Sequence, residues 1–221
     1  PAAGWNLATV GWVEGATAPR PARAATARGS AIRNEFYQVS ARRGGTGISV
    51  RHRGRALFGI RGLQLSTLAD NWGSWGSMVE AAPGVRLTQE IGRWKIARVA
   101  VIERGPLRAA LVVRLVSPRA HVDLTLRLTA GVEELAIEAR VFTDLEGARI
   151  KLVLPGARTA ECEVPAERVR RTGKGEFPVL RWLRARNGSK GFAVVSDVLA
   201  AYDLEAGDLS TLPANVSVRV V

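Results

Sequence analysis

The chain has 221 residues, of which 47% are hydrophobic and 24% are charged, a composition typical of a globular protein that buries a full core. No apolar run approaches the roughly 18 residues that a membrane-spanning helix needs, and the single cysteine, Cys162, excludes an intramolecular disulfide. The formal net charge is +12, but most basic residues are arginines dispersed along the chain, which favours solvated strand faces over a nucleic-acid-binding patch.

The N-terminal part differs in composition from the rest. Residues 1–13 hold a short strand-like piece that is too small to fold alone, and we expect it to continue from an upstream domain that precedes Pro1. Residues 14–31 are rich in Ala, Pro and Arg and lack apolar periodicity, so we expect a flexible linker or a long exposed loop. Residues 32–221 then form the β-sandwich domain, with truncation at its C-terminus left open.

Three consecutive segments show a strict two-residue periodicity. Apolar residues alternate with other residues over 107–115, 122–128 and 135–141, which predicts an antiparallel meander with one buried face. Weaker strand patterns occupy eight more segments: 36–40, 47–52, 93–104, 149–154, 160–164, 177–184, 191–196 and 216–221. Glycine and proline turn signals separate the segments, and no amphipathic helix of three turns is evident. The predicted fold class is all-β, an antiparallel sandwich or supersandwich.

Few side chains are available for catalysis. The two histidines, His52 and His121, have no second ligand at the spacing of a metal site, and we expect both to be exposed at strand ends. Neither lies near a serine or cysteine in a nucleophile–base pattern. Glu161 and Glu163 share one strand face, but acids of this kind are more often solvated than paired across a sugar. We therefore predict no catalytic residue and no metal ligand in the chain.

Tryptophan is the enriched aromatic residue, with six in the chain. Trp72 and Trp75 lie in DNWGSWG (70–76), where neighbouring glycines leave the ring faces uncovered. An apolar ring face with a polar edge suits a pyranose, and Asp70 can accept hydrogen bonds from sugar hydroxyls. We predict Asp70, Trp72 and Trp75 as carbohydrate-binding residues; the alternative is that both rings fill one end of the sandwich.

Several segments in colinear order resemble the C-terminal half of family-38 glycoside hydrolases, the α-mannosidases. The segments are PAAGW (1–5), RNEFYQV (33–39), DNWGSWG (70–76), ERGPLRA (103–109), EFPVLRW (176–182) and GFAVVSD (191–197). Each motif is weak alone, but together they span nearly the whole chain. The sequence departs from the family pattern at 142–146 and 200–202.

The resemblance implies a galactose-mutarotase-like supersandwich attached to an N-terminal catalytic domain that holds zinc and a nucleophilic aspartate. The chain would then be the C-terminal β-sandwich portion of an α-mannosidase-like hydrolase, inactive alone and without a cofactor of its own. Its expected partners are the catalytic domain of the same polypeptide and a mannose-containing carbohydrate, with no membrane. We expect a soluble protein, with the bacterial cytoplasm as its compartment.

Two other functions stay open at this point. The same architecture serves free-standing carbohydrate-binding or mutarotase-like modules, although a mutarotase needs an acid–base pair that two isolated histidines do not suggest. The basic composition also permits an arginine-rich polyanion or nucleic-acid binder, which predicts a contiguous basic face.

Overall fold

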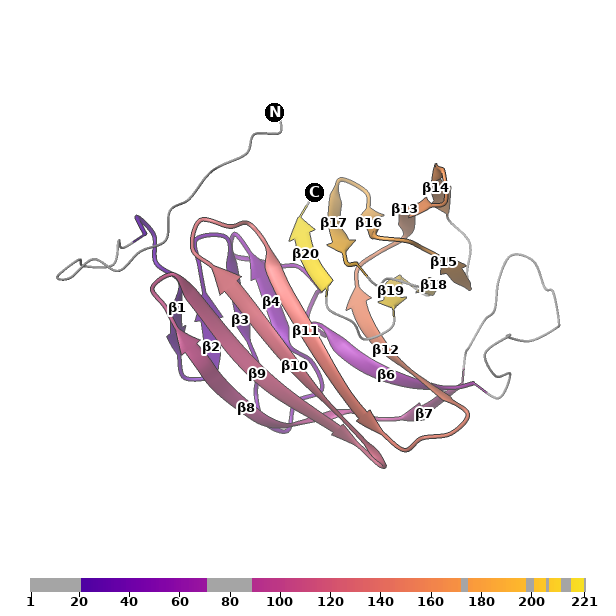
Figure 1. Cartoon of the computed structure of the whole chain (residues 1–221), viewed down its shortest axis with the longest axis horizontal. Helices are drawn as coiled ribbons and strands as arrows, with labels where there is room; N and C mark the ends of the chain where they lie inside the picture. The colour runs from indigo at the N-terminus through magenta and orange to yellow at the C-terminus, as the bar shows by residue number, and fades with distance from the viewer. Residues whose placement is uncertain are drawn as a thin grey trace, which may run out of the picture.

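The computed structural model describes residues 21–70, 89–171, 175–197, 201–205, 207–211 and 216–220, and every regular element in these ranges is a β-strand (Figure 1). No helix in the described ranges is long and apolar enough to cross a membrane. The strands are, in chain order, β1 (Thr26–Arg28), β2 (Ala31–Arg33), β3 (Tyr37–Ser40), β4 (Ser49–His52), β5 (Arg55–Ala56), β6 (Gln64–Ala69), β7 (Glu90–Gly92), β8 (Lys95–Arg104), β9 (Arg108–Ser117), β10 (Ala120–Thr129), β11 (Leu135–Thr143), β12 (Ala148–Pro155), β13 (Thr159–Val164), β14 (Glu167–Arg171), β15 (Glu176–Pro178), β16 (Trp182–Asn187), β17 (Lys190–Val195), β18 (Ala201–Glu205), β19 (Asp208–Thr211) and β20 (Val216–Val220).

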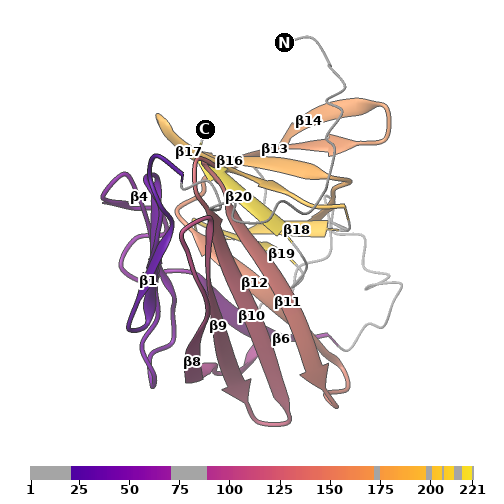
Figure 2. The same ribbon diagram turned by 60° about the vertical axis from the view of Figure 1, so that its left-hand side comes forward.

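The strands form three antiparallel sheets. A five-stranded sheet runs β1-β2-β3-β4-β5, a nine-stranded sheet runs β14-β13-β16-β17-β20-β11-β10-β9-β8, and a six-stranded sheet runs β15-β18-β19-β12-β6-β7. Figure 2 shows the five-stranded sheet as a separate layer beside β8, β9 and β10. Buried residues of all three sheets belong to one hydrophobic core. The predicted all-β sandwich is therefore confirmed for the described residues.

The alternating apolar residues of the long strands place one face of the large sheet in this core. Leu126 of β10 lies opposite Leu111 of β9 and Ile137 of β11, and Leu124 lies opposite Val113. Directly opposed residues point to the same side of a sheet, and all five side chains are almost fully buried. Each such side chain contributes about 1.5–3 kcal/mol relative to an exposed one. The predicted meander is confirmed.

The last strand of the chain lies inside the nine-stranded sheet. Strand β20 pairs with β11 on one side and with β17 on the other. Its Val218 lies opposite both Leu135 and Val194, so the buried row of the meander continues into the second half of the sheet. One half of this sheet holds β8 to β11 and the other holds β13, β14, β16 and β17. Strand β20 joins the two halves, which do not pair with each other directly.

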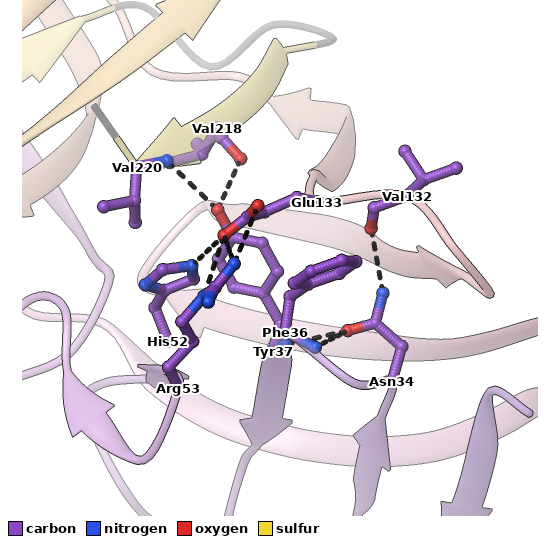
Figure 3. Close-up of polar contacts among 9 residues, drawn as sticks. All are labelled: Asn34, Phe36, Tyr37, His52, Arg53, Val132, Glu133, Val218 and Val220. Atoms are coloured by element: carbon purple, nitrogen blue, oxygen red, sulfur yellow. Dashed lines mark hydrogen bonds and ion pairs between the residues drawn. The ribbon is translucent and has the colours of Figure 1, made fainter. Parts of the chain in front are cut away.

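Tyr37 of β3 links β20 to the five-stranded sheet through two hydrogen bonds (Figure 3). Its hydroxyl accepts a hydrogen bond from the backbone N–H of Val220 at 3.2 Å and donates to the carbonyl oxygen of Val218 at 3.4 Å. Burial raises the pKa of Tyr37 to about 12. The hydroxyl therefore keeps its proton at neutral pH, and one side chain satisfies two backbone groups of β20.

Part of the predicted linker 14–31 is ordered sheet, which corrects that prediction. Within it, Thr26–Arg28 pairs with Ala31–Arg33, and Ala25 is buried with its N–H donating to the carbonyl oxygen of Pro106 at 2.8 Å. The sequence signal failed because the inward-facing residues here are alanines, whose small apolar side chains produce little periodicity.

The predicted strand 177–184 also differs from the observed one. It divides into Glu176–Pro178, which belongs to the six-stranded sheet, and Trp182–Asn187, which belongs to the nine-stranded sheet. Proline at 178 removes a backbone donor, and such a residue is typical of a strand end. Residues 1–20, including the expected strand-like piece at 1–13, lie outside the described residues.

Asn34 joins the five-stranded sheet to the turn between β10 and β11. Its amide nitrogen donates to the carbonyl oxygens of Thr129 at 2.8 Å and Val132 at 3.0 Å. Its amide oxygen accepts from the backbone N–H groups of Phe36 at 3.0 Å and Tyr37 at 2.7 Å. Asn34 is 3% exposed, so water cannot readily replace these partners.

We predict that Asn34→Ala lowers the free energy of unfolding by about 3 kcal/mol, because four backbone groups each lose their hydrogen bond to its side chain. Urea unfolding of the variant measures the loss. The control is Gln38→Ala on the exposed face of β3, which should stay within about 0.5 kcal/mol of the wild type. Equal stability of Asn34→Ala and the wild type would contradict the assigned role.

Candidate functional site

A pocket of about 630 Å³ lies where the β4–β5 turn meets the β16–β17 hairpin. Figure 2 shows β4 and β17 near each other at the end of the molecule that carries the C-terminus. Small-molecule sites commonly occupy about 300–1,000 Å³, so the pocket has the size of a ligand site. Its lining residues are His52, Arg53, Arg55, Ala56, Leu57, Gly59, Gly156, Asn187, Ser189, Lys190, Gly191, Phe192 and Val220.

The pocket wall combines an apolar part with several cationic groups. Leu57 and Val220 contribute apolar surface, whereas the lining residue Phe192 is almost fully buried and packs edge-on against Phe58, with 5.3 Å between the ring centroids. Arg55 and Lys190 contribute full positive charges, whereas no aspartate or glutamate appears among the described lining residues. Chemically, the pocket can bind an anion but offers no carboxylate pair for glycoside hydrolysis.

A two-residue turn places His52 and Arg53 at the pocket. His52 pairs with Arg55 across the β4–β5 hairpin, so Arg53 and Gly54 are the only loop residues. Their φ angles are 46° and 80°, as a type I′ hairpin turn requires. Arginine seldom adopts this conformation, but its N–H donates to the carbonyl oxygen of Phe36 at 2.7 Å, which fixes the turn.

Glu133 holds both side chains in place (Figure 3). His52 Nε2 lies 2.7 Å from Glu133 Oε1, and Arg53 donates from Nε to Oε1 at 3.1 Å and from Nη2 to Oε2 at 3.2 Å. The hydrogen bond from His52, assisted by that from Arg53, lowers the pKa of Glu133. The carboxylate thus stays ionised at neutral pH and neutralises part of the positive charge beside the pocket.

Sequence reasoning missed this arrangement. The expectation of an exposed His52 is wrong, because its side chain is only 14% exposed and its partner lies 81 residues away in the sequence. No local pattern signals a contact at such a separation. His121 lies on β10 with its ring stacked on Phe142 at a centroid distance of 4.5 Å. In the part of the chain that the structure describes, no group of three or more His, Cys, Asp or Glu side chains is placed to hold a metal.

Of the three predicted carbohydrate-binding residues, only Asp70 lies within the described residues; Trp72 and Trp75 lie outside them. Asp70 follows β6, and its Oδ2 accepts a hydrogen bond from Arg149 Nη2. Its side chain is 11% exposed, and its buried Oδ1 has no hydrogen-bond partner in the described ranges. Asp70 is therefore one member of an ion-pair network and lies apart from the residues that line the 630 Å³ pocket.

That network crosses the six-stranded sheet. Arg149 bridges Asp70 and Glu176, and Lys151 bridges Glu176 and Asp203, with 3.3 Å from Lys151 Nζ to Asp203 Oδ2. Positions 149 and 151 lie two residues apart on β12, so both cations point to the same face of the sheet. Lys151 and Asp203 are 2% and 3% exposed, and charges as buried as these persist only when paired.

Comparison with known proteins informs the fold. No family model matches the sequence, and no curated protein matches it. Among solved structures, an α-mannosidase from Enterococcus faecalis V583 matches with a TM-score of 0.65 and 11% identity, over 87% of this chain and 29% of its own. A glycosyl hydrolase family 38 protein from Enterococcus faecalis matches with a TM-score of 0.66 and 12% identity, over 95% of this chain and 31% of its own.

The predicted likeness to family-38 glycoside hydrolases is thus confirmed in the fold. The chain spans less than a third of the length of each of these two structures.

We predict that Lys151→Met lowers the free energy of unfolding by about 3–5 kcal/mol, because two carboxylates then share a buried site without the cation between them. Chemical unfolding measures the loss. Lys95→Met, at an exposed position of β8, removes the same charge and should cost less than about 1 kcal/mol. A loss in Lys151→Met no larger than that in Lys95→Met would show that the network does not stabilise the sheet.

Proposed function

We propose that the chain is the β-sandwich portion of an α-mannosidase-like glycoside hydrolase, supporting the catalytic domain and flanking the carbohydrate site. The observation that carries the proposal is the fold agreement with the family-38 structure over 95% of this chain at a TM-score of 0.66. The colinear motifs from PAAGW (1–5) to GFAVVSD (191–197) point to the same family.

The carboxylates considered for catalysis fit a structural role. Glu161 lies 3.0 Å from Arg168 Nε, and Glu163 lies 2.5 Å from Arg181 Nη2. Each acid therefore pairs with an arginine on a neighbouring segment of the sheet surface. We assign the zinc and the nucleophilic aspartate to a catalytic domain of the same polypeptide, as the family resemblance implies.

A carbohydrate contact remains part of the proposal at Asp70, Trp72 and Trp75. Carboxylates accept hydrogen bonds from sugar hydroxyls, and the side chain of Asp70 is 11% exposed, although its Oδ1 is buried. The two tryptophans follow it by two and five positions. The ion pair with Arg149 would orient the carboxylate toward such a ligand.

The outer face of the large sheet argues against the polyanion-binding alternative. Arg114 of β9 donates to both carboxylate oxygens of Asp123 of β10, at 2.7 Å and 2.6 Å. On β11, Arg140 Nη2 lies 3.0 Å from Glu138 Oε1. These ion pairs compensate part of the arginine charge on this face, which weakens the positive potential that binding of a nucleic-acid backbone requires.

We predict that the 221-residue chain alone shows no turnover of an aryl α-mannoside, with or without added zinc. The reason is that the chemistry is assigned to the catalytic domain and the sequence provides no paired catalytic acids. Release of the aryl alcohol, followed by absorbance against a buffer blank, is the measurement. Turnover that survives repurification and scales with the concentration of the chain would refute the supporting role.

A further inference from the structure

Two cations of the 630 Å³ pocket differ from the rest in having no counter-ion. His52 and Arg53 are bound to Glu133. Arg55 and Lys190 also line the pocket, but neither makes an ion pair with any described residue. Since no described acid lines the pocket, the charges of Arg55 and Lys190 have no counter-ion among the described residues. A concave site with uncompensated cations attracts small anions.

The two cations come from distant parts of the chain and are held by tight hairpins. Arg55 opens β5 directly after the two-residue turn, and Lys190 pairs with Asn187 across a second two-residue hairpin between β16 and β17. Long lysine and arginine side chains usually move freely, but short hairpin loops fix their backbone attachment points. The fold thus brings two positive charges, 135 positions apart in the sequence, to one pocket.

The remaining wall suits a small, partly apolar body. Leu57 and Val220 supply apolar surface, and Asn187 and Ser189 supply polar side chains at the hairpin tip. Val220 itself is held by Tyr37, so this part of the wall belongs to the sheet and not to a loose terminus. Sites of this size with a few polar groups hold molecules such as monosaccharides.

We propose that this pocket binds an anionic sugar, a pyranose that carries a carboxylate or a phosphate group, with the anion on Arg55 and Lys190. The pyranose part rests on the proposed function, whereas the anion part rests on the charge of the pocket alone. The arginine can make paired hydrogen bonds to a carboxylate or phosphate, and the lysine adds a point charge.

Isothermal titration calorimetry of the 221-residue chain at low salt tests the proposal, with D-glucuronate and D-glucose 6-phosphate as probes. We expect dissociation constants of about 1 mM, with weaker binding as salt is added. D-Glucose, which lacks the anion, should show no binding, and sodium acetate and inorganic phosphate, which lack the pyranose, should bind more weakly than the sugars that carry these groups.

Three variants locate the site. Arg55→Gln and Lys190→Gln should each weaken binding of D-glucuronate by about tenfold, the usual effect of one charge-assisted hydrogen bond. Arg43→Gln is the matched control, because this exposed arginine lies in the turn at the other end of β4 and does not line the pocket. Its binding should equal that of the wild type, and thermal unfolding should show that all three variants are folded.

Each other outcome overturns a defined part of the proposal. Equal binding of D-glucose and D-glucuronate, no binding of either charged sugar, or unchanged binding in both pocket variants would refute the anion site. If acetate and phosphate bind as tightly as the charged sugars, the proposed recognition of the pyranose ring is refuted. None of these results depends on mannosidase turnover, so failure here is distinguishable from failure of the proposed supporting function.

Discussion

Backbone pairing of β20 is the interaction on which the rest of the structure depends. Without this strand, β11 and β17 would present unpaired edges to each other in the middle of the nine-stranded sheet, and such edges must find other hydrogen-bond partners. With it, the buried row that passes through Leu135, Val218 and Val194 is continuous. Tyr37 connects the same strand to the five-stranded sheet, so one segment of five residues joins two sheets. Since Val220 also lines the 630 Å³ pocket, the central strand of the fold contributes directly to the candidate ligand site.

Charged side chains occur in two contrasting environments in the molecule. In the six-stranded sheet, the cations Arg149 and Lys151 alternate with buried carboxylates, and each cation is shared between two acids. Such an arrangement favours a fixed structure, because removing either cation leaves a carboxylate, Asp70 or Asp203, without its ion-pair partner. At the pocket, Glu133 compensates His52 and Arg53 only. The two cations and three carboxylates of the network all make ion pairs with one another, whereas Arg55 and Lys190 at the pocket retain charge that a ligand can meet.

Sequence patterns predicted those parts of the fold in which large apolar residues alternate. The meander from 107 to 141 was predictable because leucine and valine recur at every second position. Strand β1 was not, because its single partly buried position carries alanine, and the short strands β18 and β19 were hidden among acidic and turn-forming residues. The family motif RNEFYQV (33–39) marked Asn34 and Tyr37, but nothing local showed that they reach Thr129 and Val220. The candidate site was not predictable for the same reason. Glu133 contacts His52 across 81 residues of sequence, so no local pattern marks either residue.

The proposed function is tested most directly by the coding sequence upstream of the codon for Pro1. The account predicts, in the same reading frame, a large α/β domain with clustered histidine and aspartate residues at the spacing of a zinc site. An in-frame stop codon immediately upstream, or an unrelated domain in that position, would contradict the assignment of this chain as the supporting β-sandwich of an α-mannosidase-like hydrolase.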